Sequence, residues 1–467
     1  RREAITLLGE ALSVKPQADD VTARLDVLYT AEKMWPELLD NLKLQAAAAT
    51  DEKRRELKKR VGALLQTELE DPRGALDAYR DVLDAGFDAD AAKAIREIGD
   101  TREELRLDAA DALEPVLRAT SKNAELADVL EMRLRAQTEP TDRARTLRAI
   151  AQVTESSLGD SKRAQAALIR ALVEEPEDAE LHGEIVRLAD RLGTEGYQTY
   201  ADALAERAGT IFDANLTTDL FVRLGRVEEV HLHNDVRAAK AYAKAAEQIG
   251  DTTPTLLALD GLYSRMGDTK SLADVLERRI AIEGTATLQA DLYHRLAVLQ
   301  IKEFGEKSQG LGTLRSALEK VPDHGPSGEA ALALLDDDAL FAGAFDVLEG
   351  MYRSLGKSEE LAKLFERRVA RASGPREKIR ARLDLARVIE DHVKDAPRAQ
   401  RTVESALALD PTDVDAMTEL ERLAPVTGGW KEAADALAQA LGAQGDDIPT
   451  ATRAELWMRL GGGRRGC

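Results

Sequence analysis

Small and apolar residues recur in register along this chain of 467 residues, and no other feature of the sequence constrains the fold as strongly. Each repeat carries Ala or Gly, then Leu, Tyr or Val four residues later, then Ala or Val three residues further on. Spacings of four and three place these side chains on one face of a helix, where small residues let a neighbouring helix approach closely. The columns are Ala4, Ala75, Ala164, Ala238, Gly310 and Ala399; Leu8, Tyr79, Leu168, Tyr242, Leu314 and Val403; and Ala11, Val82, Ala171, Ala245, Ala317 and Ala406.

A second pattern alternates with the first and predicts the helix that packs against it. It consists of an apolar residue followed by Gly or Ala, at Val61-Gly62, Ile150-Ala151, Leu224-Gly225, Leu296-Ala297, Leu385-Ala386 and Leu460-Gly461. Proline follows the first pattern at Pro16, Pro176, Pro322 and Pro411, where it is expected to end the helix. The two patterns together predict a helical hairpin whose members touch through small residues.

These columns resemble the tetratricopeptide repeat family. The first helix of that repeat has bulky, Leu and Gly/Ala positions, and its second has Ala, aromatic, Ala and Pro positions. A second type of hairpin alternates with the first, and there Leu259, Tyr263 and Gly267 match the Leu, Tyr and Gly of the family. The chain departs from the family in one extra loop residue in the first hairpin, and in Asp260, where a small residue is expected. The resemblance implies an all-α, right-handed superhelical solenoid of hairpins without a β-sheet.

A longer register overlies the hairpins. A shift of 235 residues superposes Ala75 on Gly310, Arg60 on Arg295 and Ala164 on Ala399. We therefore expect one array over residues 1–460 with two super-repeats, each holding a longer unit, near 86–122 and 322–357, that inserts one additional helix. Residues 461–467 are expected to form a tail, because three consecutive glycines break the helical pattern there.

Composition narrows the possible functions. With 65 Lys and Arg against 85 Asp and Glu the net charge is −20, which disfavours nucleic-acid binding because affinity for phosphates comes chiefly from basic side chains. No run approaches the ~20 apolar residues of a membrane span, so membrane insertion is not expected. The single cysteine, Cys467, excludes an intrachain disulfide framework.

The sequence predicts no enzyme, no cofactor and no metal site. Gly310-Leu311-Gly312 is a fragment of a dinucleotide motif without its third glycine or a preceding strand, and phosphate-binding and nucleophile-elbow motifs are absent. His231 and His233 would point in different directions on a helix and cannot chelate together, so we interpret them as solvent-exposed. We interpret Asp336-Asp337-Asp338 as an acidic helix cap, since the order of ligands in a calcium loop is missing.

One basic column stands out as a candidate binding surface. By the family resemblance, the residue before the conserved Leu on the first helix, together with its neighbours, tends to face the concave groove. Arginine forks bind carboxylates bidentately, so this column would suit an acidic peptide or a C-terminal carboxylate. The alternative interpretation is a solvated helix face with intramolecular ion pairs. The candidate residues are Lys59, Arg60, Arg148, Arg223, Arg226, His294, Arg295 and Arg387.

A non-enzymatic scaffold that binds a protein or peptide on its concave surface is the function that the sequence favours, because a solenoid leaves a long surface for partners. The alternative is the regulatory or substrate-docking region of a larger enzyme, and an RNA-binding repeat is disfavoured by charge. Unpartnered apolar faces on the first and last helices would allow self-association. The preference for Arg over Lys is typical of a GC-rich bacterium. We expect a cytoplasmic location; a periplasmic one is compatible with the low cysteine content.

Overall fold

The protein is helical throughout the part that the computed structural model describes, residues 1–14, 19–444 and 448–463. Within these ranges there are 26 α-helices, one short 3₁₀-helix and one π-helical turn, and no strand. The prediction of an all-α helical-repeat array is thereby confirmed. The chain divides into two compact units, Arg1–Gly250 and Asp251–Cys467.

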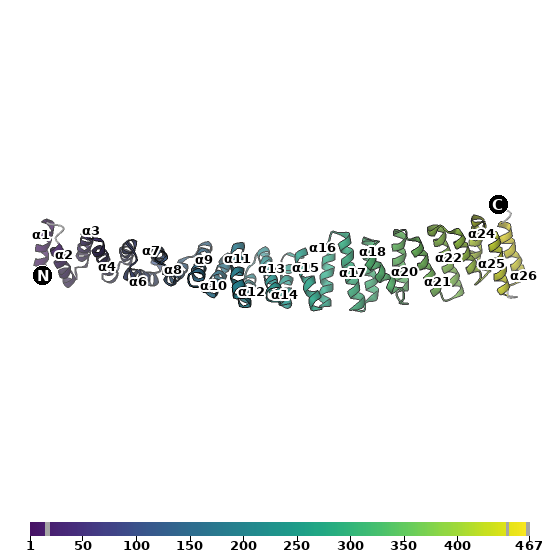
Figure 1. Ribbon diagram of the computed structural model, residues 1–467, viewed down its shortest axis with the longest axis horizontal. Helices are drawn as coiled ribbons and strands as arrows, with labels where there is room; N and C mark the ends of the chain where they lie inside the picture. Colours follow the sequence, from purple (N-terminus) through teal and green to yellow (C-terminus); the bar gives the residue numbers. More distant parts are fainter. Residues whose placement is uncertain (15–18, 445–447, 464–467) are drawn as a thin grey trace. The chain divides into compact units, whose positions relative to one another are not determined.

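In the first unit, successive helices pack against their neighbours in sequence order (Figure 1). Its helices are α1 (Arg2–Val14), α2 (Asp19–Glu32), α3 (Trp35–Ala48), α4 (Asp51–Thr67), α5 (Pro72–Asp84), α6 (Ala89–Thr101), η1 (Glu103–Leu105), α7 (Arg106–Ala119), α8 (Asn123–Ala136), α9 (Pro140–Ser156), α10 (Ser161–Glu174), α11 (Ala179–Leu192), α12 (Thr194–Ala208), α13 (Ala214–Val230) and α14 (Asp235–Ile249).

The second unit follows the same principle. Its helices are α15 (Thr253–Met266), α16 (Thr269–Ile282), α17 (Ala286–Lys302), α18 (Lys307–Lys320), α19 (Gly325–Leu334), α20 (Phe341–Ser354), α21 (Ser358–Arg371), α22 (Pro375–Val388), η2 (Ile389–Val393), α23 (Ala396–Leu407), α24 (Val414–Thr427), α25 (Trp430–Ala443) and α26 (Thr450–Gly463). Helix α26 thus continues to Gly463, beyond the expected start of a tail at Gly461. Residues 464–467 lie outside the described residues.

The predicted small columns form the contacts within hairpins. Four hairpins pair a first helix of 17 residues with the helix that follows it, in α4–α5, α9–α10, α13–α14 and α17–α18. Ala164 and Ala171 on α10 are fully buried, and the equivalent residues of the later hairpins are buried as well. Pro176, Pro322 and Pro411 each lie just beyond the end of a helix, as predicted, whereas Pro16 falls outside the described residues. On α1, by contrast, Ala4 is exposed and no residue is buried.

Glycine and tyrosine occur together in two hairpins for a steric reason. A Cβ atom on Gly62 would lie 2.7 Å from the ring of Tyr79, and one on Gly225 would lie 2.9 Å from the ring of Tyr242. Where the second helix carries Leu in place of Tyr, as at Leu168, the first helix carries Ala, as at Ala151. The size of one residue therefore sets the size of its partner across the hairpin.

The same kind of turn precedes α5, α10, α14, α18 and α23, the second helices of five hairpins. Its residue with positive φ is Glu70, Gly159, His233, Gly305 or Lys394, and the next residue is the N-cap of the second helix. His233 therefore lies in a turn and not on a helix, which corrects the placement expected from sequence, and His231 is the C-cap of α13. Both histidines are exposed, and the ring of His231 stacks on Tyr197 at 3.8 Å.

The starts of six helices in the second unit repeat those of six helices in the first unit at an interval of 235 residues. Helices α17, α18, α21, α22, α23 and α24 start 235 residues after α4, α5, α8, α9, α10 and α11; for the first pair this is 286 − 51 = 235. Three α-helices lie between α5 and α9 (α6, α7, α8) and between α18 and α22 (α19, α20, α21), whereas two, α11 and α12, lie between α10 and α13.

Candidate interaction surface

Two arginines of the predicted column, Arg60 and Arg295, and Arg459 at the equivalent position of α26 each pair with an acidic residue two helices earlier. Each is the tenth residue of its helix, and each partner is the eighth residue of its own helix. On α4, Arg60 Nη1 lies 3.1 Å from Asp26 Oδ2 of α2, and on α26, Arg459 Nε lies 3.0 Å from Glu421 Oε1 of α24. The third pair is Arg295 of α17 with Asp260 of α15. The column thus joins consecutive hairpins within each unit.

Asp260 shows why an acid replaces the small residue that the repeat pattern leads one to expect. Its side chain is only 7% exposed and accepts hydrogen bonds from Arg295 Nη1 and Nη2 at 2.7 and 2.6 Å and from Arg279. Burial by itself would raise the pKa of this carboxyl group, but the two guanidinium groups outweigh it and lower the pKa. Asp260 therefore remains charged and ties α15 to α16 and α17.

Basic residues one position earlier in the first helices pair with acids on a later helix, not on an earlier one. Lys59 and Arg148 are each the ninth residue of their helices, and each pairs with the N-cap Asp of the helix two further on. Lys59 Nζ lies 3.1 Å from Asp88 Oδ2, and Arg148 Nη2 lies 2.8 Å from Asp178 Oδ2. The hydrogen bond that Lys59 donates to Glu56 and its contacts with Asp88 raise the pKa of Lys59. These two candidate residues are largely engaged in holding successive hairpins together.

His294 occupies the same ninth position on α17 and meets His324, the residue before α19, with ring centroids 5.9 Å apart. Burial, and then the proximity of His324, lower the pKa of His294. The His324 ring donates from Nε2 to Asp291 Oδ1 at 3.0 Å, while its Nδ1 contacts Ser327 Oγ at 2.7 Å. A Ser–His–Asp chain is thus present, but Ser327 is fully buried, so no substrate carbonyl can reach its hydroxyl group.

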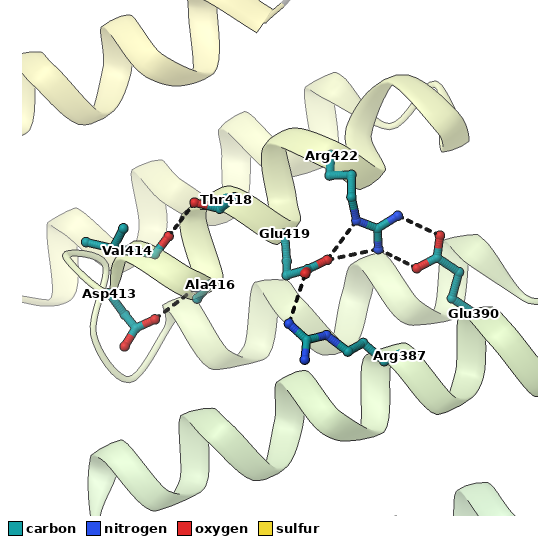
Figure 2. Close-up of polar contacts among 8 residues, drawn as sticks. All are labelled: Arg387, Glu390, Asp413, Val414, Ala416, Thr418, Glu419 and Arg422. Carbon is teal, nitrogen blue, oxygen red and sulfur yellow. Dashed lines mark hydrogen bonds and ion pairs between the residues drawn. The ribbon is translucent and has the colours of Figure 1, made fainter.

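Arg387 belongs to an exposed ion-pair network between the end of α22, η2 and α24 (Figure 2). Glu419 accepts from Arg387 Nη2 at 3.2 Å and from Arg422 Nε at 2.9 Å, and Arg422 also holds Glu390 with both terminal nitrogens. The positive charge of Arg387 is therefore balanced by acidic residues of this chain. Asp413 of the same figure is the N-cap of α24 and accepts from the Ala416 amide at 2.9 Å.

Arg223 and Arg226 on α13 differ from the rest of the column. Arg223 is the tenth residue of its helix, but the eighth residue of α11, where an acidic partner would stand, is Val186. Arg223 instead pairs with Asp219, one turn back on its own helix, at 2.6 Å. Arg226 lies one turn further along and is exposed. These two arginines are the part of the predicted column that does not connect different helices.

Sequence reasoning missed a repeated tether at the start of the first helices. The fourth residue of α4 and of α9 is Arg, and that of α17 is Gln. Arg54 donates to the carbonyls of Ala46 and Ala49, and Gln289 to those of Ile280 and Glu283. Arg143 does the same for Leu134 and Gln137. Each side chain satisfies carbonyls at the end of the preceding helix. The recurring polar residue at this position was the signal.

Other sites predicted or weighed from sequence have simple roles. Asp336-Asp337-Asp338 do not cap a helix, contrary to the expectation from sequence: the N-cap of α20 is Leu340, without a side-chain cap. Asp337 accepts from the Ala339 amide in the preceding turn and pairs with Lys307, while Asp338 pairs with Arg371. Across the described ranges, no group of three His, Cys, Asp or Glu side chains is arranged to hold a metal ion. None of the described helices combines the length and apolar character needed to cross a bilayer. Apolar side chains are exposed at Leu7 and Val14 on α1 and at Met458 on α26.

Comparison with known proteins assigns the chain to no family. No family model matches the sequence, and no curated protein matches it. A solved structure described as "Structure of Naa15/Naa10 bound to HypK-THB" is similar, with 14% sequence identity and a TM-score of 0.28. The match covers 95% of this chain and 66% of that one. The evidence for the fold therefore lies in the helices and buried columns of this chain itself.

Proposed function

We propose that the protein is a non-enzymatic scaffold of tetratricopeptide-like hairpins that binds a protein or peptide partner through the exposed face of its first helices. The main support is the contrast between α13 and the other first helices. At α4, α17 and α26 the arginine of the basic column pairs with Asp26, Asp260 or Glu421, but at α13 Val186 stands in place of the acid. Arg223 and Arg226 are left to interact with something outside the repeat.

The chemistry of this pair indicates the partner. Two guanidinium groups one turn apart can bind a carboxylate bidentately, so the partner would present acidic side chains or a free C-terminal carboxylate. Asp219 already contacts Arg223, and a stronger acceptor would displace that exposed contact at little cost. Because the contacts are at the surface, binding should weaken as salt screens them.

The experiment is capture of partners from the source organism by the wild-type chain and by the double variant Arg223→Glu/Arg226→Glu. Loss of a specific partner from the double variant is the expected result. The control is Arg24→Glu/Arg80→Glu, which makes the same change in net charge at two exposed positions on α2 and α5. Equal capture by all three proteins would exclude α13 as the binding surface, and equal loss in both variants would show a non-specific effect of net charge.

A further inference from the structure

A groove of about 650 Å³ lies over α4, between α3 and α5. Ala46 of α3 and Val61 and Leu65 of α4 form its buried apolar floor, and Leu39 and Ala78 are half-buried at its sides. The lining residues of α4 extend from 54 to 65 along one stripe, a length of about 16 Å. The helical period places this stripe on the side of α4 away from the basic column at residues 59 and 60.

The two walls of the groove carry opposite charges. Lys43 lies on the α3 wall, and Asp77 and Asp81 lie on the α5 wall. Lys58 from the floor pairs with Asp81 at 2.6 Å. Lys43 and Asp77 are exposed and form no ion pair with any residue in the described part of the chain. One free cation and one free anion thus flank an apolar floor.

Three comparable pairs of helices are bridged by ion pairs, whereas α16 and α18, both described over their full length, are not. Arg170 of α10 holds Glu131 of α8 with both terminal nitrogens, at 2.7 and 3.1 Å. Arg237 of α14 reaches Asp202 of α12 at 3.2 Å, and Arg398 of α23 reaches Glu366 of α21 at 3.0 Å. No such ion pair joins α3 to α5, both of which are described over their full length. No ion pair therefore spans the groove between these two helices.

We propose that this groove binds an amphipathic helix of a partner protein, about three turns long. Apolar side chains at positions i, i+4 and i+7 would cover the floor, since about 16 Å corresponds to eleven helical residues. Charge complementarity requires an acidic flank beside Lys43 and a basic flank beside Asp77. The groove lies away from Arg223 and Arg226, so this inference is independent of the function proposed for α13.

Two synthetic helical peptides test the proposal with the full chain. Both carry Leu at i, i+4 and i+7; one has Glu and Lys on the flanks that match the walls, and the other has these charges exchanged. Fluorescence anisotropy should show the matching peptide binding about tenfold more tightly. The charge-exchanged variant Lys43→Glu/Asp77→Lys should reverse this preference. Ala47→Trp, which fills the groove, should weaken both peptides about tenfold.

The control is Ala63→Trp, an exposed substitution on the opposite side of α4, which should leave binding unchanged. Equal affinity for the two peptides, or a preference that Lys43→Glu/Asp77→Lys does not reverse, overturns the proposal. Weakening by Ala63→Trp as large as that by Ala47→Trp also overturns it. If light scattering shows self-association that only Ala47→Trp abolishes, the occupant is a second copy of this chain and the partner-helix proposal is wrong.

Discussion

Arg295 and Asp260 face each other across α17 and α15 through two hydrogen bonds of 2.7 and 2.6 Å, at the position where the repeat would otherwise carry a small residue. The same pair of positions is Arg60 and Asp26 in the first unit. A basic residue on the face of the array can therefore hold one hairpin to the next. Arginines that pair with an acid on an earlier helix stabilise the array, and we propose that those without such an acid bind a partner.

Arg295→Glu should destabilise the protein, because it places a carboxylate beside the buried Asp260. Arg279 still neutralises part of the charge, so we expect a loss of roughly 2 kcal/mol, typical of a hydrogen bond to a charged group. Arg226→Glu changes the charge equally at an exposed position and should have almost no effect. The midpoint of urea unfolding compares the two variants. Similar midpoints would mean that the Arg295–Asp260 contact contributes nothing.

Ala171→Trp should disrupt the hairpin of α9 and α10. Ala171 is fully buried, and inserting an indole into a packed helical contact typically costs about 1–3 kcal/mol. Ala166→Trp, on the exposed face of the same helix, controls for the helical propensity of Trp. Chemical unfolding should show a lower midpoint for the first variant only. An unchanged midpoint for Ala171→Trp would show that the buried face of α10 is assigned incorrectly.

Gly225→Ala should lower stability through its contact with Tyr242, since the new Cβ atom would lie 2.9 Å from the ring. The cost should be about 1–3 kcal/mol. Tyr242→Leu in the same chain should recover much of it, because Leu168 already packs with Ala151 in the hairpin of α9 and α10. A double-mutant cycle measures the coupling directly. Additive effects of the two substitutions would contradict this steric account.

Stability should fall as pH drops below about 6.5, in part because of His182. This buried ring donates from Nε2 to the Pro176 carbonyl at 2.9 Å and accepts at Nδ1 from the Tyr200 hydroxyl at 2.6 Å. Burial lowers its pKa in the folded state, so the unfolded chain binds a proton first and stability decreases between the unfolded and folded pKa values. His182→Gln should reduce the slope of unfolding midpoint against pH between 7 and 5.5. An identical slope in this variant would exclude a role for His182.

The sequence was sufficient to predict the helical hairpins and their buried faces, which depend on local periodicity. Helical hairpins follow from columns such as Ala164, Leu168 and Ala171, because the residues that make each contact recur at fixed spacing on one helix. The roles of charged residues could not be predicted in the same way. Asp260 was noticed as a departure from the pattern, but its partner Arg295 is 35 residues away, and only the register between α15 and α17 brings them together. The tether from Arg54 was missed because its acceptors are backbone carbonyls, so the recurring polar residue has no partner residue type in the sequence to point to its role.

Amide hydrogen exchange of the full chain, with and without the partner captured by the wild-type protein, tests the scaffold account most directly. The account predicts that the partner protects α13 around Arg223 and Arg226, and that Arg223→Glu/Arg226→Glu removes this protection while exchange in the free protein stays the same. Protection confined to helices far from α13, or protection that persists in the double variant, would contradict it.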